Sequence, residues 1–251
     1  MEAYTVLAAF YDRLNAHVDY PAIRDFLLSV FEAQGIPPGA TLLDLACGTG
    51  RLTNLFAEAG YDMIAADLSP DMLAIAREES EKRGLSPLYL CQDMRALDLY
   101  GTVDAAFSFL DSLNYLSSAA DLDALFGRLK HFIAPGGLFV FDVNTRFKFE
   151  EVYRDHAYIF DEKDVFCAWQ NHYMPRRRVC DFYLTFFVRD AKGDYRRFEE
   201  TQRETYFSDR TIERAFSAHG FEKLAVYGNT DRSPVSDTDE RRYFVLQRKI
   251  L

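Results

Sequence analysis

The sequence predicts an α/β fold, with a doubly wound, mostly parallel seven-stranded sheet and an inserted antiparallel β subdomain. Three observations predict it. Apolar runs of strand length alternate with helical patterns over residues 1–145 and again after residue 208. A glycine-containing loop directly follows the first of these runs, and residues 156–207 hold strand-like runs with no helical pattern between them. Alternating strands and helices are typical of a parallel sheet covered on both faces, whereas consecutive strands favour an antiparallel sheet.

The first half of the chain supplies most of the alternation. Two amphipathic helices are expected over residues 4–15 and 20–34, the second with Pro21 in its first turn and Gly35 after its end. Five strands and three helices then alternate, which predicts a parallel arrangement. The expected strands are 41–45, 61–67, 88–92, 103–110 and 138–143; the expected helices are 52–59, 72–83 and 119–133; residues 135–137 are expected to form a turn.

The second half begins with four expected strands, at 157–160, 166–173, 179–189 and 195–207. A helix at 209–219 and strands at 221–227 and 243–248 follow, with a polar loop over 228–240. The predicted organisation is one domain formed by residues 1–145 and 208–251, which opens with helices over residues 1–35. Residues 146–207 are predicted to be an inserted antiparallel β subdomain.

Composition and charge argue against several classes of function. The 251-residue chain has a formal net charge of −10, which disfavours nucleic acid as a partner because phosphate binding needs a positive face. The arginine clusters at 176–178 and 196–197 are interpreted as solvated faces, with acidic-substrate binding as the alternative for 176–178. The four cysteines form no C-x-x-C pair and the histidines lack ligand spacing, so no metal site is expected. Without a signal peptide or a membrane-length apolar run, a cytoplasmic location is expected.

The segment Asp44-Leu45-Ala46-Cys47-Gly48-Thr49-Gly50 carries the most chemical information. A strand that ends in small residues lets a ligand approach the backbone, because glycine has no Cβ. The helix that follows offers unpaired N–H groups and the positive end of its dipole. The segment fits neither a dinucleotide-binding loop nor a Walker loop, because Thr53 occupies the third glycine position and no Gly-Lys-Ser/Thr follows.

Acidic residues also follow three other strands, where an open α/β sheet usually binds its ligand. Asp67 ends the second strand and can accept both hydroxyls of a ribose. Asp93, with Met94 beside it, suits an adenine, whose amino group donates a hydrogen bond while its faces need packing. Asp111 lies in the 109–115 segment at the end of the fourth strand. Structural alternatives stay open: Asp44 as a turn stabiliser, Asp67 as the neighbour of a helix cap, Asp93 as a surface acid and Met72 as helix core.

Together these residues resemble the class I S-adenosylmethionine-dependent methyltransferases of the small-molecule branch, which have a Rossmann-like sheet. Residues 44–50 resemble the first motif of that family, with Ala46 in place of its usual first glycine. The resemblance implies N-terminal helices that close over the cofactor and an insertion that helps cover the substrate. It implies S-adenosylmethionine as the cofactor, bound by Tyr11, Asp44, Ala46, Gly48, Gly50, Asp67, Leu68, Met72, Asp93, Met94, Phe109 and Asp111.

Methyl transfer from a sulfonium depends on alignment and on exclusion of water more than on a dedicated base, so no catalytic triad is expected. The resemblance implies transfer to a nitrogen, oxygen or carbon of a small molecule. The candidates for positioning it are Tyr4, Tyr11, Asn114, Tyr115, Asn144, Trp169 and His172. Two alternatives stay open: a non-catalytic S-adenosylmethionine-binding module or sensor, and a nicotinamide-dependent oxidoreductase. A homodimer is an open alternative to a monomer, and no nucleic acid or membrane partner is expected.

Overall fold

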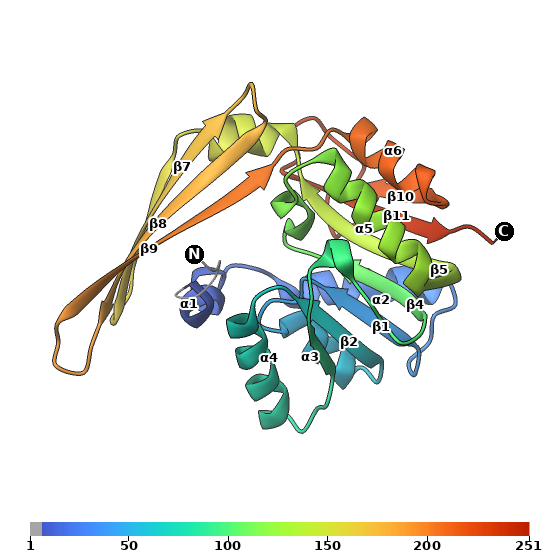
Figure 1. The fold of residues 1–251 in the computed structure, drawn as a ribbon, viewed down its shortest axis with the longest axis horizontal. Coiled ribbons are helices and arrows are strands. Elements are labelled where there is room, and N and C mark those ends of the chain that lie inside the picture. The colour runs from blue at the N-terminus through green and yellow to red at the C-terminus, as the bar shows by residue number, and fades with distance from the viewer. Residues whose placement is uncertain (1–6, 251) are drawn as a thin grey trace.

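The structure is a computed structural model that describes residues 7–250 (Figure 1). Its helices are α1 (Leu7–Leu14), α2 (Tyr20–Ala33), α3 (Arg51–Glu58), α4 (Pro70–Lys82), α5 (Ala119–Phe132) and α6 (Asp209–Ala218). A first group of strands is β1 (Thr41–Leu45), β2 (Asp62–Asp67), β3 (Leu88–Cys91), β4 (Val103–Ser108), β5 (Ile133–Asn144), β10 (Phe221–Tyr227) and β11 (Arg241–Arg248). A second group is β6 (Ala157–Asp161), β7 (Val165–Met174), β8 (Val179–Arg189) and β9 (Tyr195–Thr205).

The strands form two sheets. The first has seven strands in the order β10-β11-β5-β4-β1-β2-β3, and the second has four in the order β6-β7-β8-β9. Neighbouring strands from β5 to β3 pair in parallel, and β11 is antiparallel to both β5 and β10. All pairs of the second sheet are antiparallel. The predicted fold class is therefore confirmed, while the start of the first expected helix, including Tyr4, lies outside the described residues.

Three short helical segments were not predicted: η1 (Met94–Ala96), η2 (Ser112–Tyr115) and the π-helix η3 (Lys148–Tyr153). The predicted turn at 135–137 was wrong, because these residues lie inside β5. Val103 of β4 pairs with Ile133 and Ala105 pairs with Leu138, so the residues between form a bulge. Gly136 takes a φ of +83°, and the strand resumes its pairing after it. Glycine and proline therefore bend this strand without ending it.

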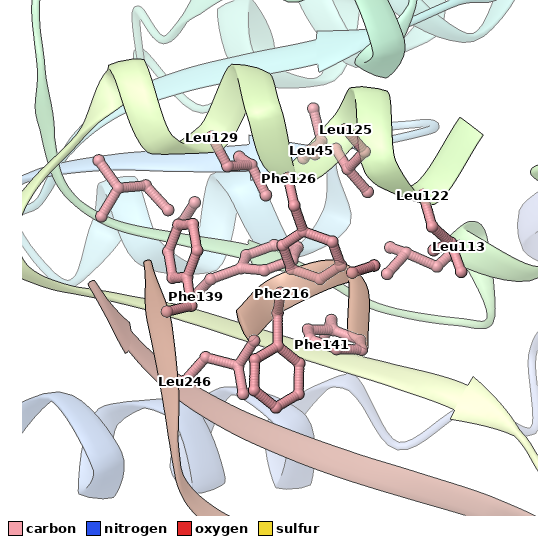
Figure 2. Close-up of a cluster of buried hydrophobic side chains, with 14 of the residues drawn as sticks. Leu45, Leu113, Leu122, Leu125, Phe126, Leu129, Phe139, Phe141, Phe216 and Leu246 are labelled. Carbon is pink, nitrogen blue, oxygen red and sulfur yellow. The ribbon is translucent and has the colours of Figure 1, made fainter. Parts of the chain in front are cut away.

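Helices cover both faces of the first sheet. Apolar residues of α2 and α3 pack on one face, with α4 on the same side, and those of α5 and α6 pack on the other. Figure 2 shows the second face, where Leu122, Phe126 and Leu129 of α5 point toward Phe139 and Phe141 of β5. All five side chains are fully buried, and each contributes about 1.5–3 kcal/mol of apolar transfer free energy. This packing fixes the strand ends from which the site is built.

The second sheet projects from the first and extends past α1 (Figure 1). Its inner face packs on α1 and η3 through a buried apolar cluster that includes Leu7, Phe149 and Phe182. The Phe10 ring of α1 stacks on Phe186 of β8, with 6.1 Å between the centroids, and Arg13 pairs with the Asp164 carboxylate at 2.6 Å. Helix α1 is therefore fastened to the second sheet while it also reaches the first.

Candidate active site

A cavity of about 660 Å³ lies where α1, the carboxyl ends of the first-sheet strands and the inner face of the second sheet meet. Such a volume is typical of pockets for small organic ligands, which measure roughly 300–1,000 Å³. The first sheet and its loops contribute Ala46, Gly48, Asp67, Leu68, Met72, Asp93, Met94, Asp111 and Tyr115. Helix α1 contributes Tyr11, and the second sheet with η3 contributes Tyr153, Phe160, Trp169, Asn171, Gln202 and Glu204.

The glycine loop turns sharply away from β1. Ala46 adopts a φ of 61°, so an alanine takes the left-handed conformation that glycine would take more readily. Gly48 has a φ of 53° and open space where a Cβ would stand, which leaves the backbone accessible to a ligand. Gly50 does not line the cavity. A Cβ there would lie 2.6 Å from the Tyr89 hydroxyl and 3.0 Å from Ala76, so Gly50 allows the loop to pack on α4 and β3 instead of contacting a ligand.

Asp44 is buried beneath this loop. Its carboxylate accepts a 2.6 Å hydrogen bond from the Thr53 hydroxyl, and burial raises the pKa of Asp44 to about 7. Asp44 lines a hollow of about 40 Å³ together with Tyr11, Arg51 and Phe109. Phe109 is otherwise a core residue, so it borders this hollow and not the main cavity. Arg51, the first residue of α3, was missed, although an arginine directly after a glycine loop is a signal for anion binding.

Asp67 ties the end of β2 to the loop. One carboxylate oxygen accepts the Gly48 N–H and the other accepts the Ser69 N–H, each at 2.8 Å. Ser69 in turn caps α4 by accepting the Met72 N–H. Burial raises the pKa of Asp67, and the two backbone hydrogen bonds oppose that rise. Each carboxylate oxygen can accept more than one hydrogen bond, so both retain capacity for a ligand.

Apolar side chains border the cavity beside Asp67. Leu68 is 65% exposed, and Met72 and Met94 line the cavity with it. Asp93 caps η1 through the Arg95 N–H at 2.8 Å, and it also pairs with the Arg95 guanidinium. That guanidinium is the main reason why the pKa of Asp93 lies below its usual range. This end of the cavity therefore combines apolar surfaces with two fixed carboxylates, Asp67 and Asp93.

A buried charge cluster lies at the opposite end. Arg241 of β11 donates to the Asp111 carboxylate at 2.9 Å and also pairs with Asp142 of β5. Burial opposes ionisation of both aspartates. For Asp111 the charges of Arg241 and Lys148 and its hydrogen bonds together outweigh burial, and its pKa falls to about 2, whereas the pKa of Asp142 is raised. Glu204 of β9 is 2% exposed, and burial, followed by the Asp111 charge, raises its pKa well above the usual range.

Two predicted positioning residues tie this cluster together and do not line the cavity. Asn114 is fully buried, and its side chain accepts the Asn144 N–H and donates to the Thr205 carbonyl, both at 2.9 Å. The Asn144 amide donates to Glu204 at 2.7 Å and to Asp111 at 2.9 Å. The expected direct contact with substrate is therefore corrected: both asparagines hold η2, β5 and β9 in register.

The two candidate residues on β7, Trp169 and His172, lie on opposite faces of the second sheet. Trp169 lies on the inner face of the second sheet and lines the cavity. His172, three residues later, points to the opposite face, because successive side chains alternate along a strand. Its side chain is 55% exposed and pairs with Asp155 at 3.2 Å. The prediction that His172 positions the substrate is therefore corrected. Tyr11 and Tyr115 both line the cavity.

Comparisons with known proteins decide the family. A family model for the methyltransferase domain matches residues 42–137. A crystal structure of an S-adenosylmethionine-dependent methyltransferase from Clostridium acetobutylicum ATCC 824 is 29% identical, with a TM-score of 0.87 and coverage of 98% of this chain and 99% of that one. The protein YqeM of Bacillus subtilis (strain 168), named as a methyltransferase, is 32% identical over 248 residues, 98% of this chain and 97% of YqeM. The chain belongs to the class I S-adenosylmethionine-dependent methyltransferases.

This methyltransferase also resembles CalS10 of Micromonospora echinaspora, an amino pentose methyltransferase whose structure contains S-adenosylmethionine. The identity is 26% and the TM-score 0.71, with 99% of this chain and 98% of CalS10 covered. Family membership sets aside the oxidoreductase alternative. Within residues 7–250, no helix of the methyltransferase is long and apolar enough to cross a bilayer. No group of three metal-binding side chains occurs in the same described part of the chain.

Proposed function

We propose that this methyltransferase binds S-adenosylmethionine along the first-sheet side of the cavity and methylates a small molecule held against the second sheet. A single observation carries the proposal. One continuous cavity is lined both by the family's motif residues and by inward-facing side chains of β7 and β9. Its volume of about 660 Å³ is in the range of small-molecule pockets, whereas a polymer would need an open groove.

The adenosine half of the cofactor fits the end of the cavity at β2 and β3. Asp67 has acceptor capacity beyond its two backbone hydrogen bonds, as a ribose diol requires. The exposed Leu68 side chain and the sulfur of Met94 border the same region, and a flat base would remove their apolar surface from water. Asp93 would accept from the adenine amino group.

The amino-acid half of the cofactor fits the glycine loop. Open space above Gly48 admits the ligand close to the backbone. Asp44 supplies a negative charge for its ammonium group, and Arg51 with the N-terminus of α3 supplies positive charge for its carboxylate. Tyr11 lines both the main cavity and the hollow beside the loop, so α1 covers the cofactor between them.

The residues of the chain bind the cofactor and the acceptor, orient them, and exclude water from the site. S-adenosylmethionine, when bound, supplies a methyl group activated by its sulfonium. The walls formed by Tyr115, Phe160 and Trp169 would hold the acceptor in line with that group, and alignment of this kind is the main contribution that the protein must make. Asp12 of α1 accepts a 2.8 Å hydrogen bond from the Thr49 hydroxyl of the loop, which holds the cover in place over the reacting groups.

Calorimetry with S-adenosylhomocysteine and transfer of a labelled methyl group from the cofactor to a metabolite extract test the proposal. We expect one binding site per chain and a labelled small molecule. Asp67→Ala should weaken binding, while His172→Ala, on the outer face of the second sheet, should leave binding unchanged. Label found only on protein or nucleic acid would contradict the proposed acceptor class, and binding without any transfer would favour a sensor.

A further inference from the structure

Polar side chains project from the second sheet into the acceptor end of the cavity. Asn171, Gln202 and Glu204 line the cavity and are 6%, 5% and 2% exposed. Asn171 of β7 and Gln202 of β9 lie at the same level of the sheet, because both pair with Phe182 of the strand between them, β8. The Asn171 carbonyl oxygen and the Gln202 amide nitrogen are buried without a hydrogen-bond partner among the described residues. Buried polar atoms are nearly always paired in native proteins, so these two atoms indicate a ligand that offers both a donor and an acceptor.

Three acidic and two cationic side chains form the charged groups at this end. Asp111, Asp142 and Glu204 are the acidic groups, and Arg241 is the cation that bonds to the two aspartates. Lys148 also lines the cavity, and its ammonium pairs with the Glu240 carboxylate at 3.2 Å. The cluster therefore carries an excess of negative charge whenever Glu204 is ionised, and a cationic group of the ligand would offset this excess.

The aromatic walls favour the same kind of ligand. The Tyr153 ring lies against Phe182, with 4.9 Å between centroids, and its hydroxyl donates to Glu204 at 3.3 Å. The Trp169 ring also lies against Phe182, with 5.7 Å between the centroids. Both Tyr153 and Trp169 line the cavity, and the Lys148 ammonium already lies over the Tyr153 ring, 5.4 Å from its centroid. Aromatic faces attract ammonium groups, and the attraction is stronger where water is excluded.

We propose that the methyl acceptor is a small amine that enters as an ammonium ion, and that the Glu204 carboxylate removes a proton from its nitrogen before methyl transfer. This inference rests on the proposed function. The proton moves from nitrogen to a Glu204 carboxylate oxygen, which frees the nitrogen lone pair. The N–C bond then forms as the S–C bond breaks, and a methylated ammonium and S-adenosylhomocysteine leave. The proton on Glu204 returns to solvent.

The surroundings of Glu204 suit a group that exchanges a proton. Asn144 and Tyr153 donate to its two carboxylate oxygens, at 2.7 Å and 3.3 Å, and so hold the carboxyl group in place. Burial and Asp111 raise its pKa, and Lys148 opposes that rise. The ionisable groups that act on it are Asp111 just before η2, Lys148 and Tyr153 of η3, and Cys180 of β8. Asp111 in turn donates its N–H to Asp142 of β5 and accepts from Arg241 of β11.

Three aromatic probes of similar size but different charge test the charge preference without turnover. Benzylamine, benzyl alcohol and benzoate are titrated into the protein loaded with S-adenosylhomocysteine, with wild type, Glu204→Gln and the control Glu199→Gln. Glu199 lies on the same strand as Glu204 but pairs with Arg197 on the exposed face. We expect wild type and Glu199→Gln to bind benzylamine about tenfold more tightly than either other probe, and Glu204→Gln to lose most of this preference.

Equal binding of the three probes, absence of binding by all three, or an unchanged preference in Glu204→Gln would overturn the inference. Failure of the protein to bind S-adenosylhomocysteine would instead contradict the proposed cofactor site. With an amine that is turned over, the rate should rise with pH as Glu204 ionises, and Glu204→Gln should lose that rise. A rate that follows the same pH profile in both proteins would also refute the role of Glu204.

Discussion

Asp44 gives a quantitative prediction about stability and pH. Its pKa is about 7 in the folded chain, against an ordinary value of 3.8 for an aspartate in an unfolded chain. The folded protein therefore binds the proton more tightly, so stability falls as pH rises between these two values. By linkage, Asp44 contributes about 2.7 kcal/mol to the free energy of unfolding at pH 5 and about 0.1 kcal/mol at pH 8. The loss of stability attributable to Asp44 between these pH values is therefore about 2.6 kcal/mol.

The perturbation is Asp44→Asn, which keeps the shape of the side chain and removes its titration. Urea unfolding at pH 5 and pH 8 gives the free energy of unfolding of each protein. The wild-type value minus the variant value should fall by about 2.6 kcal/mol between the two pH values. Subtracting the variant removes the contributions of other raised groups such as Asp142 and Glu204. Parallel pH dependences for the two proteins would refute the assignment of a buried, titrating Asp44.

Three other variants test separate parts of the structure. Asp67→Ala should weaken S-adenosylhomocysteine binding by about 10–100-fold in calorimetry, because hydrogen bonds to a charged group contribute about 1.5–3 kcal/mol. His172→Ala is the control, and an equal loss of affinity in both variants would refute the assignment of Asp67 to the ribose. Gly50→Ala should cost about 3 kcal/mol in urea unfolding, against about 1 kcal/mol for Gly84→Ala, which has a similar φ but open space around it; equal costs would remove the steric argument. Arg241→Met should destabilise by about 3–5 kcal/mol, because it leaves buried carboxylates unpaired, and a neutral effect in urea unfolding would contradict the described cluster.

Much of the fold could be predicted because local patterns are strong in the sheet. β1 and β8 have the bounds expected from their apolar runs, and β10 begins and ends where predicted. The short segments were harder. η3 has no periodic pattern of its own, and its residues are helical because Phe149 packs into the core beneath the second sheet. The bulge in β5 contains proline and glycine, and its return to register depends on pairing with β4, which a single segment does not reveal.

The site, like the fold, has residues that could be predicted from the sequence and residues that could not. Asp67, Asp93 and the loop that starts at Asp44 could be predicted because each directly follows a strand, and parallel strand ends meet at one edge. Glu204 and Arg241 could not be predicted. They lie on β9 and β11, far along the chain from Asp111, and only the folded structure brings these elements together. In β9 the inward-facing side chains are polar, so the strand lacks the alternation of apolar and polar residues that normally marks a buried face.

A crystal structure of the protein with S-adenosylhomocysteine tests the central claim most directly. We expect the ribose hydroxyls within hydrogen-bonding distance of the Asp67 carboxylate, the adenine between Leu68 and Met94, and the sulfur facing the space in front of Trp169 and Glu204. A nucleoside bound elsewhere, or one that enters the cavity with its ribose turned away from Asp67, would contradict the account.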